Sequence, residues 1–439
     1  MKFKRVDQVD QWRLCIGCGA CVPACPNQAI TLVDIPDRGI RPIVNSTKCE
    51  ECSDCVRVCP GIEMTHRPFD DRIIPELSQE WGPVIEMWEG YAADSQVRYC
   101  GSSGGLATAL ALFGLEKKGV SGVLQIGAKS EAPLKNIAVF SKNRADLLAC
   151  TGSRYSPAAP CEKFDWIKDA SGPGIFVGKP CDVVALRKSQ AVNPQLDEKV
   201  GLAISIFCAQ TPTTKGTYNI LDVLGVKPED VEEFRYRGCG WPGMTAVKTK
   251  SDNQQVYQMK YEEAWGNILS NAGQFRCRLC PDSTGEFADI SCGDPWYREV
   301  KPDEKGWSLV LVRTERGREF LQEAIREGYV RLERVRPDIL PRSQKSLLNR
   351  RRHLWGRLLT MRMMCMPVPH YIGFSLFRSW LGLPVMEKVR SLVGTLKRIV
   401  VRRWTKPLKP VIGGERLQDA EDKEKPLVNI DEIESRCKA

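Results

Sequence analysis

Short apolar runs alternate with amphipathic stretches along residues 88–335. The stretches at 103–119 and 316–328 have the apolar spacing of helices, and a strand at 307–314 precedes the second. The alternation predicts an α/β body with a largely parallel or mixed sheet. Four further runs, rich in β-branched residues and bounded by Gly or turn residues, predict strands: 122–127, 136–140, 174–178 and 200–207.

The pattern differs before and after this body. Apolar runs at 29–35 and 40–45 flank "PDRG", which predicts a strand, a turn and a strand. Residues 73–91 have the composition of a connector, and we place a domain boundary near residue 85. From about residue 341 the chain becomes basic and rich in Leu and Met.

Two cysteine runs near the start match at every cysteine position: "CIGCGACVPACP" (15–26) and "CEECSDCVRVCP" (49–60). This spacing is typical of proteins with two 4Fe–4S clusters, whereas a zinc site with four cysteines usually has paired CxxC runs. In two-cluster ferredoxins the fourth cysteine of each run ligates the other cluster. One cluster is then expected on Cys15, Cys18, Cys21 and Cys59, and the other on Cys49, Cys52, Cys55 and Cys25.

The cysteine count alone would also suit a disulfide-bonded secreted protein, because 19 of the 439 residues are cysteine. The first residues, "MKFKRVDQVDQWRLC", have no apolar h-region, so we expect no secretory signal and a cytoplasmic location. Thiols are kept reduced in the cytosol. Cysteines there more often bind metal or carry out chemistry than form a disulfide framework.

Further cysteines in the body follow predicted strands. Cys181 and Cys208 each lie at the end of a strand, where α/β sheets place ligands. Cys277 and Cys280 form a CxxC pair. These four could close a third iron–sulfur cluster, although buried free cysteines are also common small core residues.

A glycine-rich segment, "YCGSSGGLATAL" (99–110), opens one of the predicted helices. Small residues let backbone N–H groups approach an anion, and the helix dipole adds positive potential, so the segment could hold a pyrophosphate. The same composition also serves for close packing at the start of a helix.

Several motifs follow one another in a characteristic order: "SSGG", "GSRYSPAAP", "GKPCDVVALRK", "FCAQTP", "FRYRGCGWPG" and "RCRLCPDSTGEFADISCGDPW". In this order they resemble the beta-subunit family of coenzyme F420 hydrogenases and dehydrogenases, which includes plant 7-hydroxymethyl chlorophyll a reductase. The resemblance covers about residues 10–335. It implies FAD, iron–sulfur clusters and a hydride carrier that is often the deazaflavin coenzyme.

The resemblance also implies which residues lie near the redox centre. Lys179 and Arg154 are its candidate catalytic residues, because either could stabilise anionic reduced flavin; each could instead be a solvated charge. Two departures from the family pattern, Cys239 and Cys292, could replace a ligand of the third cluster. The implied flavin-binding residues are Ser102, Ser103, Gly104, Gly105, Gly152, Ser153 and Tyr155.

The basic character belongs to the C-terminal part of the chain. Residues 341–410 hold 16 Lys and Arg against one acidic residue, Glu387, whereas residues 1–340 are near neutral. The charge-free run at 363–377 is too short and too rich in Pro for a membrane span. We treat this part as an appendage, and expect its removal to leave flavin and clusters in place.

Residues 385–404 predict an amphipathic basic helix that suits an anionic membrane surface, which would make the protein peripheral on the inner face of a membrane. The alternative is a helix packed on the protein's own body. The predicted apolar stripe is Val385, Val389, Leu392, Leu396 and Ile399, and the basic residues around it are Lys388, Lys397, Arg398, Arg402 and Arg403.

These features together predict a fold class. We expect an α+β ferredoxin-like N-terminal module, an α/β flavin-binding body with a mixed sheet, and a basic helical C-terminal appendage followed by a weakly ordered charged tail. The predicted divisions are 1–85, 86–170, 171–340, 341–410 and 411–439.

The chemistry predicts an oxidoreductase that passes electrons between a two-electron hydride carrier and one-electron ferredoxin-type carriers. A flavin would lie between them, because it can take a hydride and release single electrons. The alternatives are a ferredoxin-dependent reductase of a pigment or other conjugated organic substrate, and a non-catalytic electron-transfer subunit of a larger complex. The basic segment lacks regular aromatic interleaving or a docking motif, so we expect no nucleic-acid partner.

Overall fold

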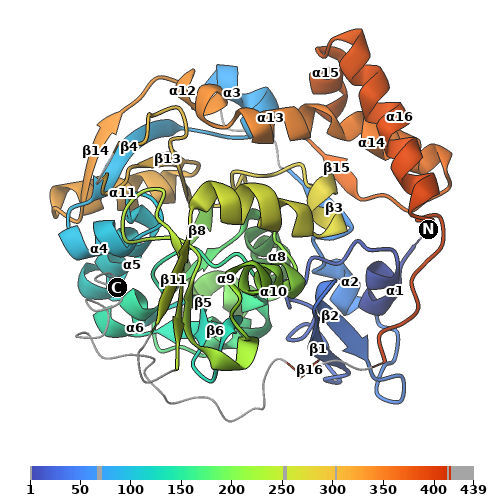
Figure 1. Cartoon of the computed structure of the whole chain (residues 1–439), viewed down its shortest axis with the longest axis horizontal. Helices are drawn as coiled ribbons and strands as arrows, with labels where there is room; N and C mark the ends of the chain where they lie inside the picture. The colour runs from blue at the N-terminus through green and yellow to red at the C-terminus, as the bar shows by residue number, and fades with distance from the viewer. Residues whose placement is uncertain (1, 67–71, 251–254, 302–303, 413–414, 417–439) are drawn as a thin grey trace.

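The central element of the fold is an eight-stranded mixed sheet with strand order β14-β4-β13-β12-β8-β7-β5-β6 (Figure 1). The computed structural model describes residues 2–66, 72–250, 255–301, 304–412 and 415–416. Strands β5, β7, β8 and β12 run parallel, and the others pair antiparallel. The strands are β4 Glu86–Ala92, β5 Gly122–Lys129, β6 Ala132–Ser141, β7 Gly174–Gly178, β8 Val200–Ile206, β12 Ile290–Gly293, β13 Ser308–Val312 and β14 Val330–Arg334.

The mixed-sheet α/β body is therefore confirmed, and strands from 86–170 and 171–340 join in one sheet. Strand β4 lies between β13 and β14, within the segment that we expected to be a connector. The sequence hid it because Glu86 and Glu89 interrupt its apolar pattern, yet both are buried. Glu89 accepts hydrogen bonds from the Tyr297 hydroxyl at 2.7 Å and from Arg298 Nε at 2.9 Å.

Helices cover both faces of the sheet, and the strand alternation decides which residues meet them. Val123, Ile175 and Leu202 pack against α5 and α11, whereas their neighbours Leu124 and Phe176 pack against α8 on the other face. The helices of the body are α3 Pro75–Trp81, α4 Ser95–Cys100, α5 Leu106–Lys117, α6 Arg144–Ala149, α7 Phe164–Lys168, α8 Pro180–Gln190, α9 Pro194–Lys199, α10 Thr214–Leu224 and α11 Glu315–Arg326.

A smaller antiparallel sheet stands beside the main one. It consists of β9 Val231–Arg235, β10 Thr245–Thr249 and β11 Val256–Met259, in the order β11-β10-β9. Ile220 and Leu221 of α10 pack with Phe234 and Val247 of this sheet in a separate apolar core. The sheet carries the loop between β9 and β10, which reaches the candidate site.

The N-terminal module contains the β-hairpin that the sequence predicted. It comprises α1 Val6–Gln11, β1 Ile30–Ile35, β2 Gly39–Val44, α2 Asp54–Arg57 and β3 Glu63–Thr65. The module is docked on the body through backbone contacts. The Cys161 N–H donates to Cys18 O at 3.0 Å, and the Lys215 N–H donates to Pro36 O at 2.7 Å.

The C-terminal segment is helical, as predicted, but it is not a separate appendage. Its strand β15 pairs in parallel with β3 of the N-terminal module. Leu354 and Met361 share one apolar core with Leu14, Met64 and Leu279. The segment comprises α12 Ile339–Ser343, α13 Lys345–Arg352, α14 Leu354–Met363, β15 His370–Ile372, α15 Leu376–Leu381 and α16 Val385–Val401.

Helix α16 packs on the protein's own body, as in the alternative prediction, but mainly through small and polar residues and not through the predicted apolar stripe. Ser391, Thr395 and Ile399 are buried, and the hydroxyl of Thr360 in α14 donates to Leu392 O at 3.4 Å. Small and polar side chains allow this close approach, so most of the aliphatic residues point outward; Val385 is 72% and Val389 45% exposed.

No helix in the described ranges is long and apolar enough to cross a membrane. Of the predicted charged tail, strand β16 Glu415–Arg416 pairs antiparallel with β1. Apart from this strand and residues 411–412, the tail lies outside the described residues.

Candidate functional site

Four body cysteines from three separate segments come together at one edge of the sheet. Cys181 lies in the first turn of α8 directly after β7, and Cys208 follows β8, the parallel neighbour of β7. Cys277 lies on the short helix η5 Phe275–Leu279, and Cys280 follows it. The Thr211 N–H points at Cys277 Sγ at 3.4 Å, which joins the β8 loop to this helix. The predicted third-cluster ligands are thus neighbours.

Their environment fits a bound iron–sulfur group. Burial raises the pKa of Cys280 to about 12, and burial with neighbouring thiols and Asp182 raises the pKa of Cys181 well above its usual value. Such thiols ionise only when a metal or cation compensates the charge. The guanidinium of Arg276 is 1% exposed and interacts with Cys181, Cys277 and Cys280. A buried cation beside four thiols suits a group with net negative charge.

The two departures from the family pattern lie elsewhere. Cys292 belongs to strand β12 and is 5% exposed; burial alone raises its pKa to about 12. Cys239 lies in the loop after β9, where it contacts Arg235. The geometry therefore favours the predicted set of four over a set that includes either residue.

The eight cysteines of the N-terminal module divide into two groups in the crossed manner. The Cys59 thiol interacts with Cys15 and Cys18 of the first run, and the Cys55 thiol interacts with Cys25 as well as with Cys49 and Cys52. Burial raises the pKa of Cys15 and Cys59 to about 12 and that of Cys55 to about 11. Throughout the described ranges, no three His, Cys, Asp or Glu side chains are placed to hold a single metal ion. A 4Fe–4S cluster is larger than one ion, so its cysteine ligands lie farther apart than the ligands of a single ion.

A cavity of about 300 Å³ opens at the carboxyl ends of β7, β8 and β12, next to the body cysteines. Cys208 lines it, so the cavity adjoins the predicted third cluster. The residues of the predicted flavin neighbourhood that line this cavity are Ser102, Ser103, Gly105, Gly152, Ser153, Arg154, Tyr155 and Lys179.

Gly104 has a different role from the one that its motif implied. A Cβ at this position would lie 2.6 Å from Gly90 O and 2.9 Å from Ser308 N. Its own N–H donates to the Ser308 hydroxyl at 2.8 Å. Gly104 therefore permits the start of α5 to pack on β4 and β13, and its neighbours Ser103 and Gly105 face the cavity.

The two predicted catalytic residues, Arg154 and Lys179, are held by different kinds of partner. Arg154 donates to Asn136 Oδ1 at 2.5 Å, to Phe234 O at 3.0 Å and to Pro133 O at 2.6 Å, so its guanidinium ties three segments together. Lys179 Nζ lies 2.6 Å from the Asp182 carboxylate. Burial alone would lower the pKa of Lys179, but Asp182 and Cys181 hold it above its usual value. Lys179 is therefore a fixed cation between the cavity and the body cysteines.

Three family models match the chain. The N-terminal and C-terminal models of the coenzyme F420 hydrogenase/dehydrogenase beta subunit match residues 87–164 and 174–338, and a 4Fe–4S dicluster model matches residues 14–61. This chain belongs to the coenzyme F420 hydrogenase/dehydrogenase beta-subunit family. The expected resemblance is thereby confirmed.

Curated members of this family are distant relatives of the chain. A coenzyme F420-dependent sulfite reductase of Methanocaldococcus jannaschii is 23% identical over 79% of this chain and 52% of its own length. The chain thus spans about half of that relative. A coenzyme F420 hydrogenase subunit beta of Methanothermobacter thermautotrophicus is 28% identical over 59% of this chain and 88% of its own.

Among solved structures, a chain of the F420-reducing NiFe hydrogenase complex of Methanosarcina barkeri is similar at 24% identity. The match covers 63% of this chain and 92% of that chain, with a TM-score of 0.49.

The family motifs also supply cavity residues that the sequence analysis had not assigned to the site. Arg237 of "RGCGWPG" is 2% exposed and donates to Asp294 at 2.7 and 3.0 Å. Its guanidinium lies 4.8 Å from the ring of Tyr261 and 5.3 Å from that of Trp296. The rings of Tyr261 and Trp296 are stacked at 5.5 Å. Arg237 belongs to "RGCGWPG", and Asp294 and Trp296 belong to "RCRLCPDSTGEFADISCGDPW". Both motifs were visible in the sequence, but only the fold brings these residues to one wall of the cavity.

Proposed function

We propose that this protein is an FAD- and iron–sulfur-dependent oxidoreductase. It passes electrons between a two-electron hydride carrier of the deazaflavin F420 type and one-electron ferredoxin-type carriers. The single observation that supports this best is the cavity whose wall includes Cys208 of the four body cysteines. A two-electron site and a one-electron site are thus in direct contact.

FAD in this cavity would supply the conversion of a hydride into single electrons. The loops at 101–105 and 152–156 line the cavity, and their small residues, such as Gly105 and Gly152, would leave room for a pyrophosphate. Gly152 at φ +107 and Gly105 at φ +73 keep the two loops in conformations that favour glycine. Lys179 would add positive charge beside the flavin ring when it is reduced.

Electrons would leave the cavity through the body cysteines toward the N-terminal module. Arg276 connects the two regions, because it donates to Pro60 O at 3.1 Å and to Gly61 O at 2.9 Å, directly after Cys59. Cys21 interacts with Cys59 and with Cys55, so the two groups of the module adjoin each other. Cys52 is exposed and marks the surface where a ferredoxin or another redox subunit would exchange electrons.

Tyr261 and Trp296 line the cavity, so aromatic side chains would contact a planar conjugated ring bound there. A deazaflavin has such a ring, and so does the organic substrate of the alternative function. We favour the deazaflavin because relatives named for different activities, a sulfite reductase, a hydrogenase subunit and a formate dehydrogenase subunit, all carry F420 in their names. The cavity disfavours a purely electron-conducting subunit.

Anaerobic purification with quantified iron, sulfide and flavin tests this function. We expect about twelve irons for three four-iron clusters, one FAD per chain, and bleaching of the flavin by reduced F420. Ala107→Phe on α5 would fill the cavity without backbone strain and should yield flavin-free protein with its iron intact, whereas Ala107→Ser should retain flavin. Full flavin occupancy in Ala107→Phe would refute the site.

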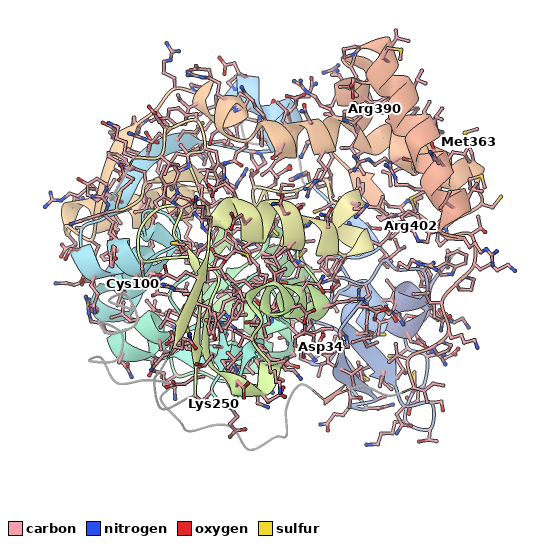
Figure 2. The ribbon with its side chains drawn as sticks, viewed as in Figure 1. Asp34, Cys100, Lys250, Met363, Arg390 and Arg402 are labelled. Carbon is pink, nitrogen blue, oxygen red and sulfur yellow. The ribbon has the colours of Figure 1, made fainter. Side chains whose placement is uncertain are left out.

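We also propose that the protein works on the inner face of a membrane through α16. Most of the outward aliphatic residues follow at three- and four-residue steps, and the basic residues Arg390 of α16 and Arg402, which directly follows the helix, belong to the same region (Figure 2). Such a face suits anionic headgroups, at about 1 kcal/mol per basic residue near the surface. Its exposed residues are Val385, Met386, Val389, Val393, Leu396 and Val400.

Flotation with vesicles tests this location. The protein should bind vesicles rich in phosphatidylglycerol at low salt and be released at high salt, because the Debye length shrinks. Val393→Glu should abolish binding, and Val223→Glu on α10, where Val223 is 67% exposed, should not. No binding at low salt, or a soluble dimer joined through α16, would contradict the proposal.

A further inference from the structure

The C-terminal segment contacts the CxxC loop through three backbone carbonyls, those of Arg278, Leu279 and Pro281. Arg357 Nη1 of α14 donates to Arg278 O at 2.9 Å, and the Tyr371 hydroxyl of β15 donates to Leu279 O. Arg351 Nη1 of α13 donates to Pro281 O at 2.9 Å. Three elements of the segment thus hold the backbone on either side of Cys280.

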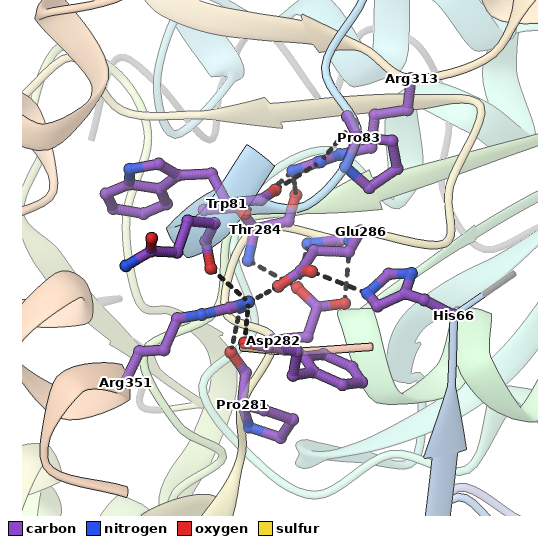
Figure 3. A network of polar contacts seen from close by, with 12 residues as sticks. His66, Trp81, Pro83, Pro281, Asp282, Thr284, Glu286, Arg313 and Arg351 are labelled. Atoms are coloured by element: carbon purple, nitrogen blue, oxygen red, sulfur yellow. Dashed lines mark hydrogen bonds and ion pairs between the residues drawn. The ribbon is translucent and has the colours of Figure 1, made fainter. Parts of the chain in front are cut away.

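Arg351 is fixed by a buried polar network (Figure 3). It pairs with Glu286, which also contacts His66 Nε2 at 2.8 Å, and it donates to Phe374 O at 3.2 Å. Burial alone would raise the pKa of Glu286, but Arg351 and His66 hold it at about 2. The carboxylate is therefore charged at neutral pH, and it fixes the orientation of Arg351 toward the loop.

Several arginines gather beside the CxxC loop. Burial and the nearby Arg350, Arg398 and Arg278 lower the pKa of Arg357 to about 10. In the part of the chain that the structure describes, neither Arg357 nor Arg278 pairs with a carboxylate. Arg278 interacts instead with Cys277, and Arg350 with Cys208. Mutually repelling arginines beside two thiols fit an anionic group bound on the cysteines.

We propose that Arg351, Arg357 and Tyr371 are positioning residues for the third iron–sulfur site, so that the C-terminal segment is a part of that site. They hold the CxxC loop in the conformation that directs Cys277 and Cys280 toward Cys181 and Cys208. Because Arg357 holds the Arg278 carbonyl, it also keeps the Arg278 charge beside Cys277, where this charge stabilises the cluster's reduced, more negative state. The proposal rests on the third cluster of the proposed function.

The test compares two arginines of the same helix. Arg357→Gln removes the contact to the loop, whereas Arg362→Gln changes an exposed residue of α14. In Arg357→Gln we expect a lower midpoint potential for the third cluster in an EPR titration. Iron of this cluster should be lost to a chelator on the order of 10-fold faster, as is usual when an outer-shell partner is removed. Arg362→Gln should match the parent.

Tyr371→Phe offers a gentler variant, because it removes only the hydroxyl that contacts Leu279 O. It should accelerate proteolytic cutting of the 275–286 loop in cluster-free protein. If the parent protein contains only about eight irons, the third cluster does not exist and the proposed function fails at that point. The other decisive outcome is parent protein with about twelve irons and both variants with unchanged midpoint potential, chelator rate and proteolysis. This outcome would overturn the positioning role of Arg351, Arg357 and Tyr371 and leave the third cluster in place.

Discussion

The N-terminal module and the body cysteine site are built in opposite ways. In the module, eight cysteines come from two runs within residues 15–60, and each group of four uses three cysteines of one run. In the body, four cysteines come from residues 181 to 280 and are held by side chains from residues 351 to 371. One site is specified by spacing and the other by the whole fold.

This difference shows where a metal site is vulnerable. A run of closely spaced ligands retains its geometry as long as its own turn is formed. A site closed by distant segments depends on every packing contact between them. The body site should therefore respond more strongly than the module to changes far from its ligands.

The largest expected effect comes from removing the C-terminal segment. A chain that ends at Leu340 loses Arg351, Arg357 and Tyr371, and iron should fall from about twelve to about eight per chain as the body cluster is lost. A chain that ends at Pro410 should keep all of its iron. This expectation replaces the one from sequence, in which the segment was dispensable. Retention of about twelve irons in the shorter chain would show that the body site also closes locally.

A cysteine exchange in the module should have a smaller and more confined effect. Cys25→Ser removes a thiol that interacts with Cys55 of the second run. We expect EPR to show damage to the cluster of Cys49, Cys52 and Cys55, while the other two clusters keep their signals. Damage confined to the cluster of Cys15, Cys18 and Cys21 would mean that the ligands are not crossed.

The smallest effect is expected where the two regions meet. Arg276→Gln removes a buried positive charge between them and should lower the midpoint potentials of the body cluster and of the cluster that includes Cys59. If the lost stabilisation is on the order of 1 kcal/mol, each shift is about 40 mV. Iron content should stay at the parental value. A shift at only one cluster would show that Arg276 does not lie between them.

The sequence predicted those parts that depend on local pattern. The cysteine runs, the hairpin around "PDRG" and strands such as 174–178 follow from spacing and periodicity. Strand β4 was hidden because buried Glu86 and Glu89 look polar until their partners are known. The role of Gly104 and the inward face of α16 were also missed, since each depends on a neighbour distant in the chain.

The joining of the two chain ends has a consequence for how the protein is made. Arg13 near the start donates to Lys406 O at 3.1 Å. The loop that contains Cys280 is held by Arg357, which is synthesised later. At about 5–20 residues per second, a ribosome adds the stretch from Cys280 to Arg357 in roughly 4–15 s. During that interval the body thiols are synthesised but unclamped, and they are open to oxidation or to the wrong metal. Delivery of the proposed cluster to this site would therefore follow the synthesis of Arg357, whereas the N-terminal runs are complete early and could be loaded on the growing chain.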